Sequence, residues 1–190
     1  MRLKMLALLV GFGFAAPSGL LAQTALDATL RTCWSCHGEN GLSKDPTVPI
    51  IFGQQAAYLE KQLRDFRAGD RDSQIMSSMA EAIPRDDIAR AAAFIAGKAW
   101  PGHPAEPAPR PAAIATCQAC HGESLAGGLS PEGVAPRLAG QFADYLDEQM
   151  SAFARGERAN AKTMTAMMTT LSAADRDAMA KYLAGLRPAD

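Results

Sequence analysis

The apolar residues of this chain recur at the spacing of an α-helix. Between Gln55 and Ala68, apolar side chains return every three or four positions, and charged side chains fill the opposite face. The apolar set is Tyr58, Leu59, Leu63 and Phe66, and the charged set is Lys61, Arg64 and Asp65. Gly69 follows at a place where helices commonly end. The pattern predicts an amphipathic helix that buries one face in a core.

Similar signals predict further helices along the chain. The first covers residues 26–36, and another opens at Pro84 with two acidic residues in its first turn and is followed by Gly97. Near the C-terminal end, Ser172 is a suitable N-cap for a helix that ends at Gly185. The apolar faces consist of Ile88, Ala91, Ala92 and Ile95 in the former and of Met179, Tyr182 and Leu183 in the latter. Because no stretch alternates apolar and polar residues, the predicted fold class is all-α.

The helical pattern occurs twice. Cys33 is matched by Cys117, 84 positions later, and after a loop that is three residues longer the offset is a constant 87. Pro49, Gly53, Gln54, Tyr58, Leu59, Gln62, Phe66, Gly69 and Arg71 thus match Pro136, Gly140, Gln141, Tyr145, Leu146, Gln149, Phe153, Gly156 and Arg158. One more residue brings Met76 and Met79 onto Met164 and Met167. So many matches in one order indicate an internal duplication.

A proline-rich segment separates the two copies. Residues 101–111 contain five prolines, which disfavour a helix and predict an extended, semi-rigid spacer. The expected organisation is an N-terminal domain over residues 23–100, this linker, and a C-terminal domain over residues 112–190. His103 lies in the linker and is expected to be a solvated residue.

Residues 1–22 have the pattern of an export signal. Arg2 and Lys4 precede an apolar run from Met5 to Ala16, and Ala22 offers a small residue for cleavage. An uncleaved membrane anchor is the alternative, although glycines and Pro17 interrupt the run. Export predicts a periplasmic location, either soluble or loosely associated with a membrane.

The net charge argues against nucleic acid as a partner. The whole chain carries −1, and residues 1–22 hold two cations and no acid, so that the remainder carries −3. Proteins that bind nucleic acid present a basic face instead.

Two short motifs carry the candidate chemistry. Cys33-Trp34-Ser35-Cys36-His37 and Cys117-Gln118-Ala119-Cys120-His121 both read C-x-x-C-H, and they use all four cysteines and two of the three histidines. This is the attachment pattern of c-type haem, in which each thiol forms a thioether and the histidine binds the iron. The sequence predicts two covalently bound haem c groups, which would also supply each small domain with a large apolar body for its core.

Three other uses of the cysteines compete with haem attachment. A four-Cys zinc site would leave both histidines unexplained, and a thioredoxin-like redox pair would need a βαβ pattern that neither copy shows. Two disulfides in an exported protein would also account for the cysteines. A histidine directly after both motifs favours haem over all three.

The second axial ligand of each iron is expected to be methionine. His103 is the sole histidine left, so two-His ligation at both irons is impossible within this chain. Methionine opposite histidine raises the haem potential into the range of electron carriers. The repeat offers two matched pairs, Met76 with Met164 and Met79 with Met167, between which periodicity alone does not choose. Met150 and Met179 have no match in the other copy and are expected in the core.

The ordered motifs resemble those of the cytochrome c4 family. Each copy has C-x-x-C-H-G, a proline, G-Q-x-x-x-Y-L-x-x-Q-x-x-x-F-x-x-G-x-R, a methionine pair and a last helix, and the match covers nearly all of residues 24–187. The resemblance implies two class I cytochrome c domains related by a pseudo-twofold axis. It implies Met76 and Met164 as the axial sulfur ligands, beside His37 and His121.

The resemblance also implies roles around the ligands. The carbonyls of Pro49 and Pro136 would accept a hydrogen bond from the proximal histidines, and Tyr58 and Tyr145 would lie near a propionate or serve as core residues. Where the second copy has Arg137, the first has Ile50. Phe52 and Arg137 are therefore expected to make the two haem edges unequal.

The function implied is that of a dihaem electron carrier without enzymatic activity. The resemblance suggests a quinol-oxidising complex or a dehydrogenase as electron donor and a terminal oxidase as acceptor. The alternatives are the cytochrome subunit of a periplasmic dehydrogenase complex and a dihaem peroxidase or thiosulfate-oxidising enzyme. The enzyme reading ranks lowest, because both copies provide a methionine and an enzyme needs an open or unusually ligated iron.

Overall fold

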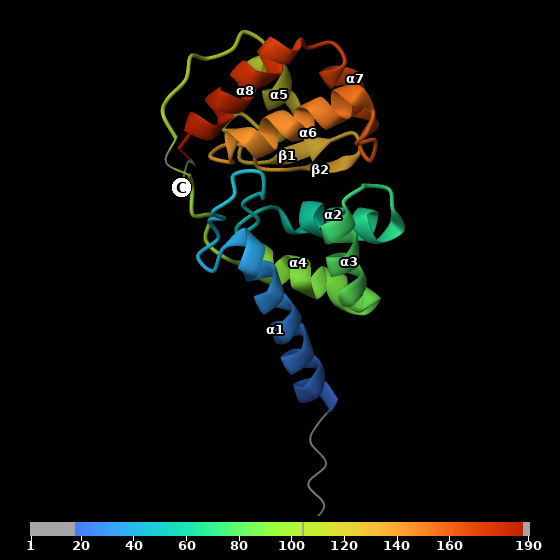
Figure 1. The fold of residues 1–190 in the computed structure, drawn as a ribbon. Coiled ribbons are helices and arrows are strands. Elements are labelled where there is room, and N and C mark those ends of the chain that lie inside the picture. Colours follow the sequence, from blue (N-terminus) through green and yellow to red (C-terminus); the bar gives the residue numbers. More distant parts are fainter. Residues whose placement is uncertain (1–17, 104, 188–190) are drawn as a thin grey trace, which may run out of the picture.

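The computed structural model describes residues 18–103 and 105–187, which form two helical halves stacked on each other (Figure 1). The N-terminal half contains α1 (Ser18–His37), α2 (Ala56–Ala68), α3 (Gln74–Ala82), a 3₁₀ turn (Arg85–Asp87) and α4 (Ile88–Ala96). The C-terminal half contains α5 (Ile114–His121), α6 (Ala143–Arg155), α7 (Lys162–Met168) and α8 (Ala173–Gly185). The helical class expected from the sequence is confirmed.

Two features were not predicted from the sequence. The methionine pairs lie in the short helices α3 and α7, for which no helix was predicted. In α3, Ser73 caps the helix by accepting a hydrogen bond from the backbone N–H of Met76. The longer loop of the second copy forms an antiparallel pair of strands, β1 (Gly128–Ser130) and β2 (Gly133–Ala135). No alternating pattern in the sequence predicted them.

Each half buries its own core. In the N-terminal half α2 packs on α3 and α4, and the buried apolar residues are Leu26, Leu30, Phe52, Leu59, Ile83, Ile88, Ala91, Ala92 and Ile95. In the C-terminal half α6 packs on α7 and α8 over Ile114, Cys117, Leu125, Ala139, Leu146, Met150, Phe153, Met168, Met179, Ala180 and Leu183. Met150 and Met179 are core residues, as expected.

The predicted export signal lies partly within the described structure. Residues 1–17 of the predicted signal lie outside the described residues, and the expected cleavage point at Ala22 lies within α1. Figure 1 shows the start of α1 extending away from the body of the N-terminal half. Within the described part of the chain, no helix combines the length and apolar character needed to cross a membrane.

The segment between the halves lies against the C-terminal half (Figure 1). His103 is half-buried, with its ring centre 4.7 Å from that of Phe142, so the expectation of a solvated residue is wrong. Further along, a Cβ added to Gly185 would lie 2.8 Å from the carbonyl oxygen of Glu106. The linker follows the surface because apolar side chains such as Phe142 offer it contacts.

Glutamine side chains join the two halves symmetrically. Gln54 accepts from the backbone N–H of Arg137 (2.8 Å) and donates to its carbonyl oxygen (3.0 Å). Gln141 makes the same two bonds to Ile50, at 2.8 and 2.9 Å. Each glutamine thus binds the residue that is equivalent to the other glutamine's target, as a twofold axis requires.

Two buried arginines complete this interface. Arg71 donates to Gln62 (2.7 Å), Tyr145 (3.1 Å) and Gln149 (2.6 Å). Arg158 donates to Gln149 (2.7 Å), Tyr58 (3.2 Å) and Gln62 (3.0 Å), which is the same set after exchange of the halves. The backbones of the two arginines also form an antiparallel bridge. The pseudo-twofold relation expected from the duplication is therefore present in the hydrogen bonds.

Candidate functional site

The four cysteines lie at the C-terminal ends of α1 and α5. Cys33 and Cys36 are three residues apart on a helix, as are Cys117 and Cys120, so each pair shares one helix face. None of the four is paired in a disulfide. Burial raises the pKa of the Cys33 and Cys117 thiols. Each half therefore presents two cysteine side chains on one helix face, which is the arrangement that thioether formation to haem uses.

The histidine that follows each pair is buried and fixed. His37 and His121 are 7% and 5% exposed. Their Nδ1 atoms lie 2.8 Å from the carbonyl oxygens of Pro49 and Pro136, respectively. Since a carbonyl can only accept, Nδ1 carries the proton. The contact expected from the family resemblance is confirmed.

This geometry prepares both rings for a metal. Burial lowers the pKa of His37 and of His121, which keeps the imidazoles neutral. With the proton on Nδ1, the Nε2 lone pair is left for iron, and a hydrogen bond to the other nitrogen orients the ring and increases its basicity. The donor set fits a haem iron in each half.

The methionines that are candidates for the second iron ligand lie on α3 in the N-terminal half and on α7 in the C-terminal half. Met76 and Met79 are three residues apart on α3, and Met164 and Met167 have the same relation on α7. Both members of a pair therefore share a helix face. Met164 and Met167 also both pack against the C-terminal core.

The tyrosines of the repeat lie at the boundary between the halves. Tyr58 and Tyr145 accept hydrogen bonds from the arginines of the opposite half, so they are interface residues. Burial raises the pKa of Tyr145, but the nearby Arg71 and Arg158 outweigh this effect and the net pKa is lowered. The arginines themselves had no role assigned from sequence. The signal for one was that both copies have an arginine two residues after the glycine that ends the helix.

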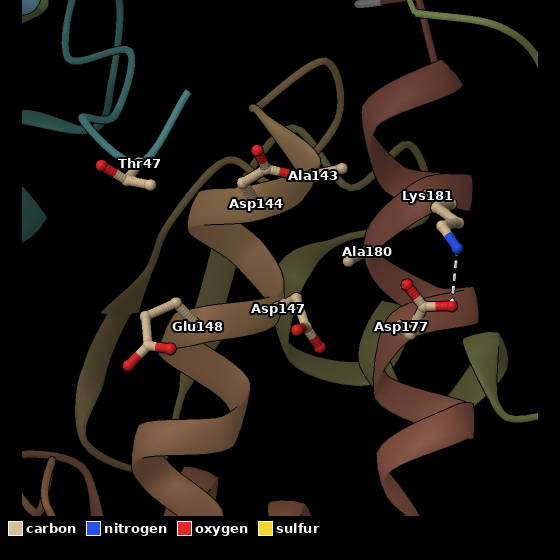
Figure 2. A pocket seen from close by; sticks show the side chains of 8 residues that line it. All are labelled: Thr47, Ala143, Asp144, Asp147, Glu148, Asp177, Ala180 and Lys181. Carbon is tan, nitrogen blue, oxygen red and sulfur yellow. Dashed lines mark hydrogen bonds and ion pairs between the residues drawn. The ribbon is translucent and has the colours of Figure 1, made fainter. Parts of the chain in front are cut away.

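A polar pocket elsewhere on the surface contains none of the predicted haem-binding residues. Figure 2 shows this pocket, which is lined by α6, α8 and Thr47 of the opposite half. Its charged residues are Asp144, Asp147, Glu148, Asp177 and Lys181, and Lys181 is already paired with Asp177 at 2.7 Å. Among the described residues no group of three or more His, Cys, Asp and Glu side chains is arranged to hold a metal ion. The four-Cys zinc site considered from the sequence is thus not assembled.

Comparison with known proteins agrees with the geometry. Residues 112–187 match the family model described as cytochrome c. The chain is 31% identical to cytochrome c4 of Pseudomonas aeruginosa, over 94% of this chain and 93% of that protein. It is 30% identical to a protein of Stutzerimonas stutzeri named thiosulfate dehydrogenase electron acceptor, over 95% of this chain and 91% of the other.

The fold comparison gives the same family. The crystal structure of reduced cytochrome c4 from Pseudomonas stutzeri superposes with a TM-score of 0.72 at 27% identity, covering 87% of this chain and 98% of that one. The cysteine pairs at 33/36 and 117/120 accordingly carry two covalently bound haem c groups. The chain belongs to the cytochrome c4 family, whose members are dihaem electron carriers.

Proposed function

We propose that this chain carries electrons in the periplasm through two His/Met-ligated haems and has no enzymatic activity of its own. The observation that carries the proposal is the repeated proximal site. In both halves a buried histidine follows the thiol pair and has its Nδ1 held 2.8 Å from a proline carbonyl. A site of this kind, closed by sulfur on the other side, passes electrons and excludes substrates.

The residues have separate roles in this proposal. Bound haem supplies an iron that alternates between the ferrous and ferric states. Cys33, Cys36, Cys117 and Cys120 would anchor the macrocycles, His37 and His121 would bind iron through Nε2, and Met76 and Met164 would supply the sulfur ligands. Because Pro49 and Pro136 fix the histidine rings, the ligands need little rearrangement when the iron changes charge.

Substitution of the methionines tests the ligand assignment. In the purified holoprotein, Met76→Ala and Met164→Ala should each abolish the methionine-to-ferric-iron charge-transfer band of one haem. Its potential should fall by a sizeable part of the ~0.8 V range that axial ligands span. Met79→Ala and Met167→Ala are the matched controls and should keep both bands. Loss of the bands in the controls instead would assign the ligands to Met79 and Met167.

A redox titration of the unmodified holoprotein tests the carrier function. Optical and magnetic spectra recorded together should show two low-spin haems that titrate reversibly. A high-spin iron at rest would contradict the proposal and favour the dihaem peroxidase-type enzyme.

The partners are redox proteins, and we propose a quinol-oxidising complex or a periplasmic dehydrogenase as donor and a terminal oxidase as acceptor. One finding favours a second candidate, in which the chain serves a dehydrogenase as its cytochrome subunit. The similarity to a protein named thiosulfate dehydrogenase electron acceptor supports it. Size-exclusion chromatography of a native periplasmic extract separates the two, because only a tightly bound subunit co-elutes with a larger dehydrogenase.

A further inference from the structure

Two buried N–H groups that lack a partner meet at the boundary between the halves. Among the described residues, Trp100 Nε1 and Arg137 Nε are the buried side-chain nitrogen or oxygen atoms with no hydrogen bond. The two side chains are in contact, with the Arg137 Cζ 5.2 Å from the centre of the Trp100 ring. An unsatisfied buried N–H costs about 1–3 kcal/mol. Two of them side by side indicate a missing acceptor.

The interface fixes the backbones of both residues. Gln54 binds the backbone N–H and the backbone carbonyl of Arg137, at 2.8 and 3.0 Å. Its neighbour Gly53, at φ +66°, packs so closely on Trp100 that a Cβ at Gly53 would lie 2.8 Å from the backbone nitrogen of Trp100. The backbones that carry the indole and the guanidinium are therefore held by adjacent residues of one turn.

The two donor groups, Arg137 Nε and Trp100 Nε1, are suited to bind an anion. Arginine Nε and tryptophan Nε1 are donors that cannot accept, so the missing group must be an acceptor. Burial lowers the pKa of Arg137, because its cation is partly desolvated, and no carboxylate pairs with it in the described part of the chain. A carboxylate, with two oxygens, can accept from both donors and neutralise the charge.

The position of Arg137 indicates which carboxylate. Arg137 directly follows Pro136, whose carbonyl binds His121 of the C-terminal half. We propose that Arg137 Nε and Trp100 Nε1 donate to a propionate of the C-terminal haem and raise the potential of that haem. This rests on the proposed function in requiring a haem on Cys117 and Cys120. The equivalent of Arg137 is Ile50, which is apolar and 1% exposed, so the N-terminal half has no such donor at this position.

The expected effect on the potential follows from charge. A cation near a haem disfavours the ferric state, whose iron has one more positive charge than the ferrous state. Replacing Arg137 by the residue of the other half, Arg137→Ile, should therefore lower the potential of the C-terminal haem and leave the N-terminal haem unchanged. The constant for electron exchange between the haems should shift about tenfold for one nearby unit charge. Trp100→Phe, which keeps the ring and removes the donor, should shift it in the same direction by less.

Spectroelectrochemical titration of the holoprotein measures both potentials. Haem methyl resonances assign each potential through nuclear Overhauser contacts with side chains of one half or of the other. Arg155→Gln is the control for loss of charge, since Arg155 is exposed and paired with Glu148 and Glu157. An unchanged C-terminal potential in Arg137→Ile, or a shift confined to the N-terminal haem, would overturn the proposal. Haem content per chain separates this failure from failure of the proposed function, which would show as absent haem.

A second measurement does not depend on the arginine variant. In holoprotein labelled with ¹⁵N-tryptophan, the indole N–H of Trp100 should exchange slowly and resonate downfield, because it is hydrogen-bonded to an anion. Trp34, the other tryptophan of the chain, is the internal reference, and Trp100→Phe assigns the signals. A Trp100 indole signal at the position of a free N–H would contradict the proposed contact.

Discussion

In each half, the space beside the turn after the haem motif is filled by one large and one small residue. The two halves take the large residue from different positions. In the N-terminal half this turn contains Gly41, at φ +84°, and a Cβ there would lie 2.6 Å from the ring of Phe52. In the C-terminal half the equivalent residues are Leu125, at φ +57°, and Ala139. A small residue beside a large one has thus become a large residue beside a small one. Cores tolerate such exchanges when the total volume is kept.

The exchange has a conformational cost. Both turns close with the same backbone hydrogen bond, from Gly41 to Gly38 at 3.0 Å and from Leu125 to Gly122 at 2.9 Å. The turn therefore demands a left-handed residue, and Leu125 is the non-glycine residue with positive φ among those described. A left-handed leucine costs roughly 1–2 kcal/mol, which the burial of its side chain to 2% exposure offsets.

The glutamine and arginine hydrogen bonds that join the halves have not diverged in this way. The bonds of Gln54 and Arg71 are repeated by Gln141 and Arg158 with the halves exchanged. The comparison teaches that a core needs only its total volume, which two residues can share in different ways. A symmetric interface needs each polar atom to find its partner on both sides of the axis, which fixes the residue types.

The largest effect is expected from removal of one thiol pair. The double variants Cys33→Ser with Cys36→Ser, and Cys117→Ser with Cys120→Ser, should each lose one covalent haem and keep the other, because each half holds its haem with its own residues. Pyridine haemochrome per chain and intact mass measure the loss. Retention of both haems in either double variant would contradict the assignment.

The second largest effect tests the exchanged volume. Phe52→Ala should cost about 3–5 kcal/mol in the free energy of unfolding and Leu125→Ala about 2–5 kcal/mol, because both leave a cavity. Guanidinium unfolding followed by circular dichroism measures both.

Transplanting the N-terminal pair sharpens this test. The combination of Leu125→Gly with Ala139→Phe should recover stability relative to either single change, with a coupling of about 0.5–3 kcal/mol. Additive losses in the double-mutant cycle would show that the two pairs are not equivalent.

Much of this arrangement could be predicted from the sequence, and the reason is physical. The C-x-x-C-H motifs place three ligating groups within five residues, so local spacing alone fixes their geometry. Helix α2 was expected because a 3.6-residue apolar period runs along it, and α8 because Ser172, a short apolar stripe and Gly185 mark its course. Their observed bounds, Ala56–Ala68 and Ala173–Gly185, lie within one residue of the expected ends.

The features that were missed depend on contacts across long separations. Tyr58 accepts a hydrogen bond from Arg158, which is 100 residues away in the sequence, and no local pattern indicates this bond. The position of His103 is set by Phe142 of the other half, which no local pattern specifies. Helices α3 and α7 were missed because nine and seven residues are too short for an apolar period to stand out.

Removing either interface arginine should lower the stability by an intermediate amount, and the loss should be equal for Arg71 and Arg158. Arg71→Ala and Arg158→Ala each remove one of the arginine bonds to Gln62, one to Gln149 and the bond to one tyrosine, while the remaining arginine still donates to both glutamines. Each lost hydrogen bond costs about 0.5–1.5 kcal/mol, so both variants should be destabilised by at least that amount. Thermal unfolding of the holoprotein measures the loss.

The exposed Arg64→Ala is the control for this test. Its ion pair with Glu60 lies on the surface, and such pairs contribute about 0–1 kcal/mol. A large difference between Arg71→Ala and Arg158→Ala would show that the symmetry of the hydrogen bonds does not extend to their energies.

The smallest effect concerns how the last helix of each half begins. Ser172 accepts from the backbone N–H of Asp175 at 3.1 Å, and the Asp175 side chain accepts from the backbone N–H of Ser172 at 3.2 Å, which forms a capping box. Helix α4 instead follows a 3₁₀ turn, and Asp87 makes no side-chain cap. Ser172→Ala should therefore weaken α8 by about 1 kcal/mol. Asp87→Ala should not weaken the start of α4 in this way, because Asp87 makes no cap there to lose. Hydrogen exchange of the first-turn amides measures each helix separately. Ser172→Thr keeps the hydroxyl and should preserve the protection, so equal loss in the alanine and threonine variants would show that the hydroxyl is not what holds α8.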